Sequence, residues 1–228
     1  VTPGQYRVYL SPQALTEVTN ILSWGGFGLK AHRTKQTPLL RMVEADVRLS
    51  ADVTMRENTA AGLAPDFNAS GFVKPKVVTM SDGGRFNDCL VSPRSAKEYG
   101  VATNAASDGE SPESLEILAG RLAADRAAAE LREGIYVNNL WYLNYSDRPA
   151  CRVTGMTRFA SFWVAKGVIT QPLNVMRFDE SMLKMFGPKL VGLTAEREPI
   201  LSNSTYGQRS TDSAHLPGAL VDDVSFTL

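Results

Sequence analysis

Few side chains of the metal-binding type occur in this sequence. It contains two histidines, His32 and His215, and two cysteines, Cys89 and Cys151, all far apart along the chain. A zinc site needs imidazole or thiolate donors at short recurring spacings, such as a Cys-x-x-Cys pair. No such spacing is present, so we interpret both histidines as surface residues. We interpret the cysteines as small buried groups or free thiols in a reducing compartment.

Acidic side chains could support a different chemistry. Glu17, the adjacent Asp222 and Asp223, and the nearby Glu196 and Glu198 could supply carboxylates for acid–base catalysis. Neighbouring acids on a strand or loop are usually solvated, so a catalytic role is the less favoured interpretation. The Gly-x-Ser-x-Gly turn of many serine hydrolases is absent, and a Ser-His-Asp arrangement in another context stays a weakly supported alternative.

Aromatic residues are concentrated in one short part of the chain, at Trp141, Tyr142, Tyr145, Phe159, Phe162 and Trp163. Core packing is the plainer explanation. If the run around Trp141 is a strand, however, its neighbours face the opposite side, so some rings lie outside the core. Exposed aromatic surface is typical of subunit and peptide contacts. We therefore predict such contacts at Trp141, Tyr142, Thr157, Arg158 and Phe159, with Arg158 able to bind a carboxylate or a carbonyl group.

The overall composition is that of a globular protein without a strong charge. Hydrophobic residues make up 43% of the chain, and 24 basic side chains balance 24 acidic ones. A neutral chain lacks the positive field that binds phosphate backbones, which argues against nucleic acid as a partner. No run approaches the roughly 18 apolar residues of a membrane span. No signal peptide is recognisable near Val1, so we expect a cytoplasmic protein.

A predicted strand and helix open the chain. Residues 6–10 are aromatic and β-branched, and Ser11 followed by Pro12 is typical of a helix start. Apolar residues then recur at three- and four-residue spacing until Gly25 and Gly26, which predicts a helix with one buried face. We further predict a strand over 44–55, a long loop over 59–75, a hairpin over 77–91 that turns at Asp82-Gly83, and a short helix after Ser92-Pro93.

The second half is predicted to contain mostly strands. Residues 103–114 are poor in apolar side chains and indicate an exposed linker. Residues 113–133 are rich in strong helix formers, with possible ion pairs Arg121–Asp125 and Arg126–Glu130. We then expect short strands over 135–143, 152–156, 159–165 and 168–170, a short helix over 179–186 capped by Asp179, and a closing strand over 220–228. This order favours an α+β fold with largely antiparallel sheets, sandwich or barrel-like, and a few packed helices.

Several segments together resemble one known family. Residues 134–141, 154–158, 162–169 and 174–178 resemble the signature of the TldD/PmbA family, also called modulators of DNA gyrase. The opening from Pro3 and the closing segment 219–224 are similar to the two ends of that family's C-terminal domain. The resemblance thus implies one C-terminal domain over residues 1–228. It also implies an N-terminal domain, which we expect upstream because the chain begins at Val1 rather than at a methionine.

The resemblance also implies where a metal site would be. TldD-type members carry the zinc motif HExxxH on the first helix and a cysteine ligand near the C-terminus. The corresponding stretches here run from Ser11 to Glu17 and from Ser204 to Gln208, without histidine or cysteine. Degenerate metal-site positions are therefore expected at Pro12, Gln13, Glu17 and Tyr206. We expect no metal in this chain and zinc only in a TldD-type partner.

The family offers a role for such a chain. By resemblance we expect a PmbA/TldE-like, non-catalytic partner of a TldD-type zinc metallopeptidase, which helps to form a cavity around unfolded peptides. Two alternatives stay open. One is a hydrolase that works without the family's zinc site, and the other is a homodimeric scaffold that binds peptides.

Overall fold

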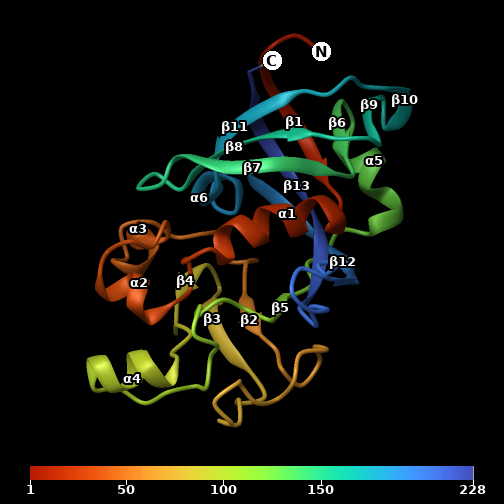
Figure 1. Cartoon of the computed structure of the whole chain (residues 1–228). Coiled ribbons are helices and arrows are strands. Elements are labelled where there is room, and N and C mark those ends of the chain that lie inside the picture. Colours follow the sequence, from red (N-terminus) through yellow and green to blue (C-terminus); the bar gives the residue numbers. More distant parts are fainter. Residues whose placement is uncertain (228) are drawn as a thin grey trace.

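A branched, mostly antiparallel sheet forms the framework of the molecule (Figure 1). The computed structural model describes residues 1–227, which contain 13 strands in this sheet. The main path runs β10-β9-β6-β1-β13-β5-β2-β3-β4, with β12 and β11 added to β13 and with β8 and β7 beyond β11. The α+β prediction is confirmed, and the sheet does not close into a barrel.

Two long strands occupy the centre of the sheet. β1 (Gly4–Leu10) pairs antiparallel with the second half of β13 (Ser213–Phe226), which brings the two ends of the chain together (Figure 1). The remaining strands, in chain order, are β2 (Met55–Glu57), β3 (Val78–Asp82), β4 (Arg85–Phe86), β5 (Ser114–Ile117), β6 (Gly134–Val137), β7 (Leu140–Asp147), β8 (Arg152–Thr157), β9 (Ser161–Ala165), β10 (Val168–Pro172), β11 (Arg177–Ser181) and β12 (Leu190–Leu201).

β13 connects the parts of the sheet. Along its length it pairs with β1, β12 and β11 antiparallel and with β5 parallel. Six consecutive residues, from Leu216 to Val221, are buried. A strand that is buried on both faces loses the alternation of apolar and polar residues. β13 begins seven residues before the predicted closing strand, because its first half pairs with β12 and β5.

Helix α1 (Pro12–Ser23) packs on the sheet with its apolar face. Leu15 and Val18 are fully buried, as their spacing predicts. The Ser11 hydroxyl accepts the Ala14 N–H and donates to the Asn138 carbonyl, so the cap also attaches the helix to the segment after β6. α1 therefore has one face held by the core and the opposite face free.

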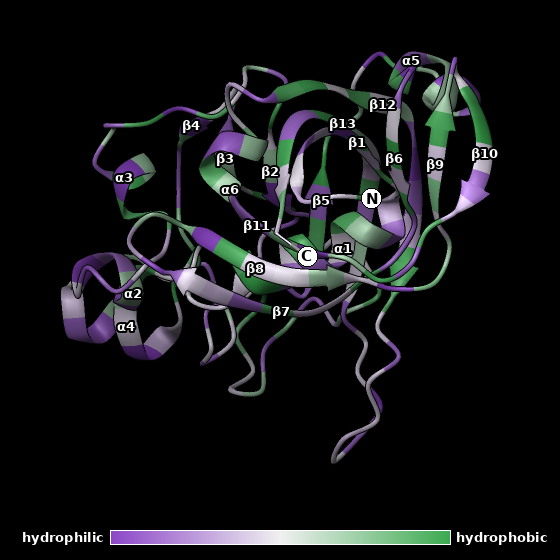
Figure 2. Ribbon diagram, turned by 90° about the horizontal axis from the view of Figure 1, so that it is seen from above, coloured by the Kyte–Doolittle hydropathy of each residue, from purple (hydrophilic) through white to green (hydrophobic). Residues whose placement is uncertain are grey.

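The other helices are short. They are α2 (Leu29–Arg33), α3 (Leu40–Val43), α4 (Pro93–Tyr99), α5 (Ala127–Leu131) and α6 (Met182–Met185), with a 3₁₀ helix at Ala124–Arg126. In Figure 2, α2 and α4 lie at the edge of the molecule and are mostly hydrophilic. The predicted helix after Ser92-Pro93 is confirmed, as is the hairpin, whose Gly83 and Gly84 both have positive φ.

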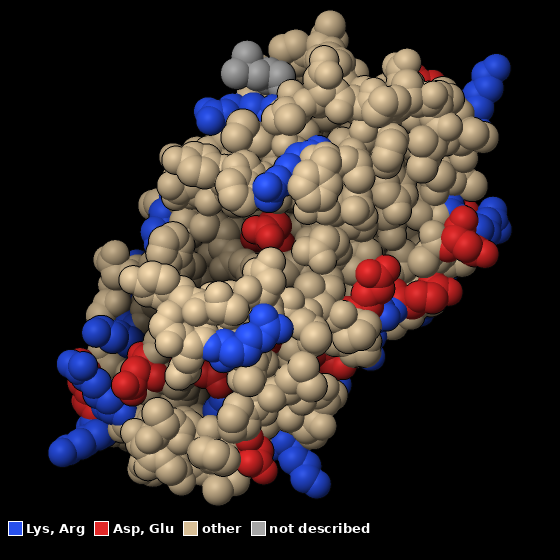
Figure 3. Space-filling view, turned by 45° about the vertical axis from the view of Figure 1, so that its right-hand side comes forward, with Lys and Arg blue, Asp and Glu red and all other residues tan. Residues whose placement is uncertain are grey.

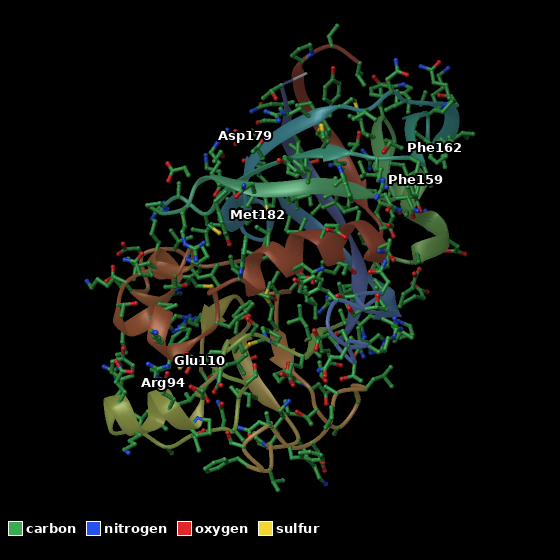
Figure 4. All side chains as sticks on the ribbon, viewed as in Figure 1. Arg94, Glu110, Phe159, Phe162, Asp179 and Met182 are labelled. Carbon is green, nitrogen blue, oxygen red and sulfur yellow. The ribbon has the colours of Figure 1, made fainter. Side chains whose placement is uncertain are left out.

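One buried carboxylate joins α2 and α4. Residues 103–113, most of the predicted linker, contain no helix or strand, yet Glu110 is only 3% exposed. Its two carboxylate oxygens accept the Lys30 N–H and both the N–H and the hydroxyl of Ser92. The segment is therefore fastened to the start of both helices, in the part of the molecule where Figure 4 labels Glu110.

Two predictions of regular structure are wrong. The helix over 113–133 is instead β5, an extended segment, the 3₁₀ helix and α5. Pairing of β5 with β13 and β2 outweighs the helix propensity of the segment. The Arg126–Glu130 ion pair does form, at 3.3 Å. The strand over 44–55 is wrong too: residues 44–54 have neither helix nor strand, and β2 begins at Met55.

Two further predictions need adjustment. The run 135–143 is split into β6 and β7, which pair with different neighbours. Asp179 does not cap a helix, since it lies in β11 and forms an ion pair with Arg152, while Ser181 precedes the four-residue helix α6. Cys89 and Cys151 are both free and buried. Within residues 1–227, no helix is long and apolar enough to cross a membrane.

Candidate functional site

The free face of α1 lines a cavity of about 290 Å³. The opposite wall comes from the end of β12, the start of β13 and the connection between them, with Leu201, Asn203 and Asp212 among the lining residues. Figure 3 shows a hollow on the surface of the molecule, with an acidic side chain on its wall and a basic side chain beside it. The cavity is open to solvent and mainly polar.

The polar residues of α1 follow helical spacing. Gln13, Thr16, Glu17 and Asn20 recur at three- and four-residue intervals, which places them on one face. The Thr16 hydroxyl donates to the Pro12 carbonyl of its own helix. Gln13 and Asn20 are exposed, and their amide groups form no hydrogen bond within residues 1–227. These two amides are thus available to a ligand.

Glu17 is the only charged residue of α1. Burial raises the pKa of its carboxyl group, and the positive charge of Arg158 opposes this rise. Arg158 comes from the turn after β8, so two predicted site residues that are distant in sequence affect each other electrostatically.

The guanidinium group of Arg158 lies on aromatic rings. Its central carbon is 4.1 Å from the ring centre of Trp141 and 5.1 Å from that of Phe159. The main chain fixes this arrangement, because the Arg158 N–H donates to the Asn139 carbonyl and the Asn138 N–H donates to the Ala160 carbonyl. Since Asn138 is also bound by Ser11, the turn lies near the N-terminal end of α1.

The other predicted site residues have different surroundings. Thr157 is buried, and its hydroxyl accepts the Met176 N–H, so it holds β8 in place. Tyr142 is 71% exposed and has a positive φ at an irregularity of β7. Pro12 is buried at the first position of α1. Tyr206 is almost fully exposed and lines a neighbouring cavity of about 440 Å³, which shares Asp212 with the first.

The sequence interpretation missed Asn20, Asn203 and Asp212 as cavity residues. Asn20 could have been found, because it lies seven residues after Gln13 on the polar face of a predicted helix. Asn203 and Asp212 come from the β12–β13 connection, and their place opposite α1 depends on strand pairing.

The side chains of the cavity do not form a metal site. Within residues 1–227, no three histidine, cysteine, aspartate or glutamate side chains lie close enough together to hold a metal ion. His32 is half-buried and bonds to the Gly26 carbonyl, and burial lowers its pKa. A single carboxylate with carboxamide neighbours lacks the imidazole and thiolate donors that bind Zn²⁺.

The alternative acidic pairs have structural surroundings. Asp222 forms an ion pair with Arg7 across β1 and β13, at 2.5 Å. Glu196 accepts the Ala124 N–H at the start of the 3₁₀ helix. Glu198 and Asp223 are exposed on strands at a different part of the surface from the cavity lining. These contacts favour solvated or stabilising roles for both pairs.

Comparison with known proteins identifies a family for this chain. A family model described as the PmbA/TldA metallopeptidase C-terminal domain matches residues 3–228. No curated protein matches the sequence.

Three solved structures share the fold over the whole of this chain. TldE from Thermococcus kodakarensis has a TM-score of 0.82 at 13% identity, with 51% of its chain covered. A candidate modulator of a DNA gyrase from Thermotoga maritima has a TM-score of 0.79 at 13% identity, with 50% covered. Another from Bacteroides thetaiotaomicron has a TM-score of 0.73 at 19% identity, with 48% covered. This chain therefore spans about half the length of each.

Proposed function

This chain belongs to the PmbA/TldD metallopeptidase family by its C-terminal domain, and from this membership we propose that it is a PmbA/TldE-like subunit without catalytic activity of its own. Its partner would be a TldD-type zinc peptidase that cleaves unfolded peptides in the cytoplasm. The zinc would be bound by that partner, and the cavity beside α1 would contribute to the space that receives the peptide.

One observation carries this proposal. The face of α1 on which the family resemblance would place the metal motif presents Gln13, Glu17 and Asn20 instead. A carboxamide is not a zinc ligand of the usual kind, and Glu17 alone cannot complete a coordination sphere of three protein ligands. Zinc does not fit this residue set, so no step of peptide cleavage is assigned to this chain.

The same residues suit a different task. Carboxamide groups donate and accept hydrogen bonds, as the peptide main chain does. Gln13 and Asn20 can therefore bind a peptide backbone without regard to its side chains. Such binding supports a subunit that positions varied unfolded peptides near a metal ion held by another chain.

Exposed aromatic rings favour a second candidate, a peptide-binding homodimer. Trp141, Tyr142 and Phe159 are 48%, 71% and 63% exposed. Apolar rings of this kind are common at the centres of protein interfaces. In this alternative a second copy of the chain would take the place of the TldD-type subunit.

Co-purification tests the main proposal. The full-length protein and the TldD-type subunit of the same genome are mixed and analysed by size-exclusion chromatography, metal analysis and peptide cleavage. We expect one complex, with zinc only in the TldD-type subunit. A dimer of this protein alone, together with no co-elution, would favour the homodimer.

Matched substitutions separate the roles of the two subunits. We expect Glu17→Gln to reduce cleavage by the complex far less than the roughly 100-fold or greater loss that follows removal of a general base. The matching control removes the glutamate of HExxxH in the partner and should abolish cleavage. Stoichiometric zinc in this protein alone, with peptide cleavage that a chelator stops, would refute the proposal.

A further inference from the structure

Two arginines of this chain stack on aromatic rings, but they use their N–H groups differently. The guanidinium of Arg148 lies 4.8 Å from the ring centre of Tyr145 and donates to the carbonyls of Gln36 and Trp24, both at 3.0 Å. It thereby holds the β7–β8 hairpin against the segments after α1 and α2. Arg148 is therefore a structural residue.

Arg158 also stacks on aromatic rings, but its side chain donates no hydrogen bond to a main-chain carbonyl in the described part of the chain. Its guanidinium lies on Trp141 and Phe159, and within residues 1–227 it forms neither a side-chain hydrogen bond nor an ion pair. Arg158 is exposed, so water reaches its N–H groups, and a ligand that accepts hydrogen bonds can replace that water. A stacked guanidinium with free N–H groups is a typical receptor for an anion.

We propose that Arg158 binds the C-terminal carboxylate of a peptide whose main chain lies along the polar face of α1. This inference rests on the proposed peptide-binding role and names the part of the substrate that is recognised. Arg158 is then a substrate-binding residue and takes no part in bond cleavage.

The geometry of the support favours a carboxylate. The central carbon of the guanidinium group lies over the rings of Trp141 and Phe159, and its N–H groups donate to no other residue within residues 1–227. A planar guanidinium with free N–H groups matches the two oxygens of a carboxylate, which accept two parallel hydrogen bonds. The rings also limit the rotamers of Arg158, so less conformational entropy is lost when the ligand binds.

The position of Arg158 relative to α1 favours a chain end. The turn that carries Arg158 is tied through Asn138 to Ser11, beside the N-terminus of α1. The positive end of the helix dipole adds to the attraction for an anion there. Further along α1, Gln13 and Asn20 are separated by a rise of roughly 10 Å, which corresponds to about three residues of an extended peptide.

The charges of the cavity favour a peptide that lies with its C-terminal carboxylate beside Arg158. Its lining contains Glu17 and Asp212 and no lysine or arginine. Acidic side chains of a ligand would be repelled along the cavity, whereas a negative charge is favoured only beside Arg158. Glu17 does not neutralise Arg158, because no ion pair joins them within 4.0 Å, although the two charges interact at longer range.

A pair of peptides tests the inference. The probe is an octapeptide of alternating Ala, Thr and Val residues with fluorescein on its N-terminus, prepared once with a free C-terminal carboxylate and once as the C-terminal amide. Binding to the full-length protein is measured by fluorescence anisotropy. We expect the free acid to bind roughly tenfold more tightly than the amide, as for a hydrogen-bonded charge pair.

Substitutions assign the preference to Arg158. Arg158→Gln should remove the difference between the two peptides, and Arg158→Lys should restore only part of it, because lysine lacks the planar fork. Trp141→Ala keeps the charge but removes the support and should give an intermediate preference. The charge-matched control is Arg94→Gln, an exposed residue of α4 at the end of the molecule opposite Phe159 (Figure 4), which should keep the full preference.

The other outcomes are distinguishable. If the unchanged protein binds acid and amide equally, the role of Arg158 is refuted while peptide binding stands. If it binds neither, both the cavity proposal and this inference fail. If Arg158→Gln keeps the preference for the acid but weakens association with the TldD-type subunit, Arg158 is an interface residue and the inference is wrong. Far-UV circular dichroism of each variant confirms that it is folded.

Discussion

Glu17 and Glu180 show how surroundings decide the behaviour of the same side chain. Both are withdrawn from solvent, and burial by itself raises the pKa of either carboxyl group. For Glu17, the distant positive charge of Arg158 opposes the effect of burial but does not outweigh it, and the pKa stays raised. For Glu180, hydrogen bonds from Lys189, Ser181 and Ser225 outweigh burial and lower the pKa. The charged form of Glu180 therefore stabilises the fold, whereas the charged form of Glu17, which lines the cavity, is disfavoured by burial.

Loss of the Glu180 partner should be strongly destabilising. Lys189 Nζ lies 2.6 Å from a carboxylate oxygen of Glu180, whose side chain is 2% exposed. Lys189→Met leaves that charge buried and without its cation, which we expect to cost roughly 3–5 kcal/mol in the free energy of unfolding. Urea unfolding followed by circular dichroism measures the loss. The double variant with Glu180→Gln should recover part of it, and a double variant no more stable than Lys189→Met would contradict this explanation.

The ion pair of Glu180 and Lys189 also predicts how the stability of the protein depends on pH. Because the pKa of Glu180 is lowered in the folded state, its contribution is complete above the ordinary glutamate pKa of about 4.3 and is lost as pH falls through the lowered native value. Lys189→Met removes the main cause of that lowering. The acid-unfolding midpoint of the variant should therefore lie at a higher pH than that of the unchanged protein.

At the scale of elements, the two faces of α1 should respond differently to substitution. Leu15 is fully buried in the main core, whereas Gln13 on the opposite face is exposed. We expect Leu15→Ala to lower the free energy of unfolding by roughly 2–5 kcal/mol and Gln13→Ala to change it by less than about 0.5 kcal/mol. Urea unfolding of both variants checks this. Similar losses for the two would show that α1 does not pack as described.

Local signals predicted some elements and failed for others. α1 could be predicted because a serine cap, a proline and an apolar repeat agree within one segment, and α4 because it has the same serine cap and proline. Residues 114–117 could not, since their helix propensity is overridden by pairing with β13 and β2, which are distant in sequence. For the site, the family resemblance predicted Gln13 and Glu17, and the structure places both on the polar face of α1. The stacking of Arg158 on Trp141 could be suspected as a cluster, but its position beside α1 depends on the contact of two turns.

At the scale of the whole molecule, we expect β13 to make unfolding cooperative. It pairs with β1 and β11, which belong to one part of the sheet, and with β5, which leads to β2, β3 and β4. We expect amide hydrogen exchange to be slowest in the buried stretch from Leu216 to Val221, because these amides open only when the whole sheet does. Near-UV and far-UV circular dichroism should show one common urea transition. Faster exchange in β13 than in β8 or β9 would contradict this.

The place of β13 in the chain also affects how the protein is made. Every strand that pairs with β13 precedes it in sequence, and β1 precedes it by almost the entire chain. On the ribosome, β1, β5 and β12 are therefore synthesised before the strand that completes their hydrogen bonds. Until then their edges are open to pairing with other nascent chains, which makes this stage the one most exposed to aggregation. A chaperone that shields strand edges during translation would thus increase the yield of folded protein most when synthesis of the last segment is slow.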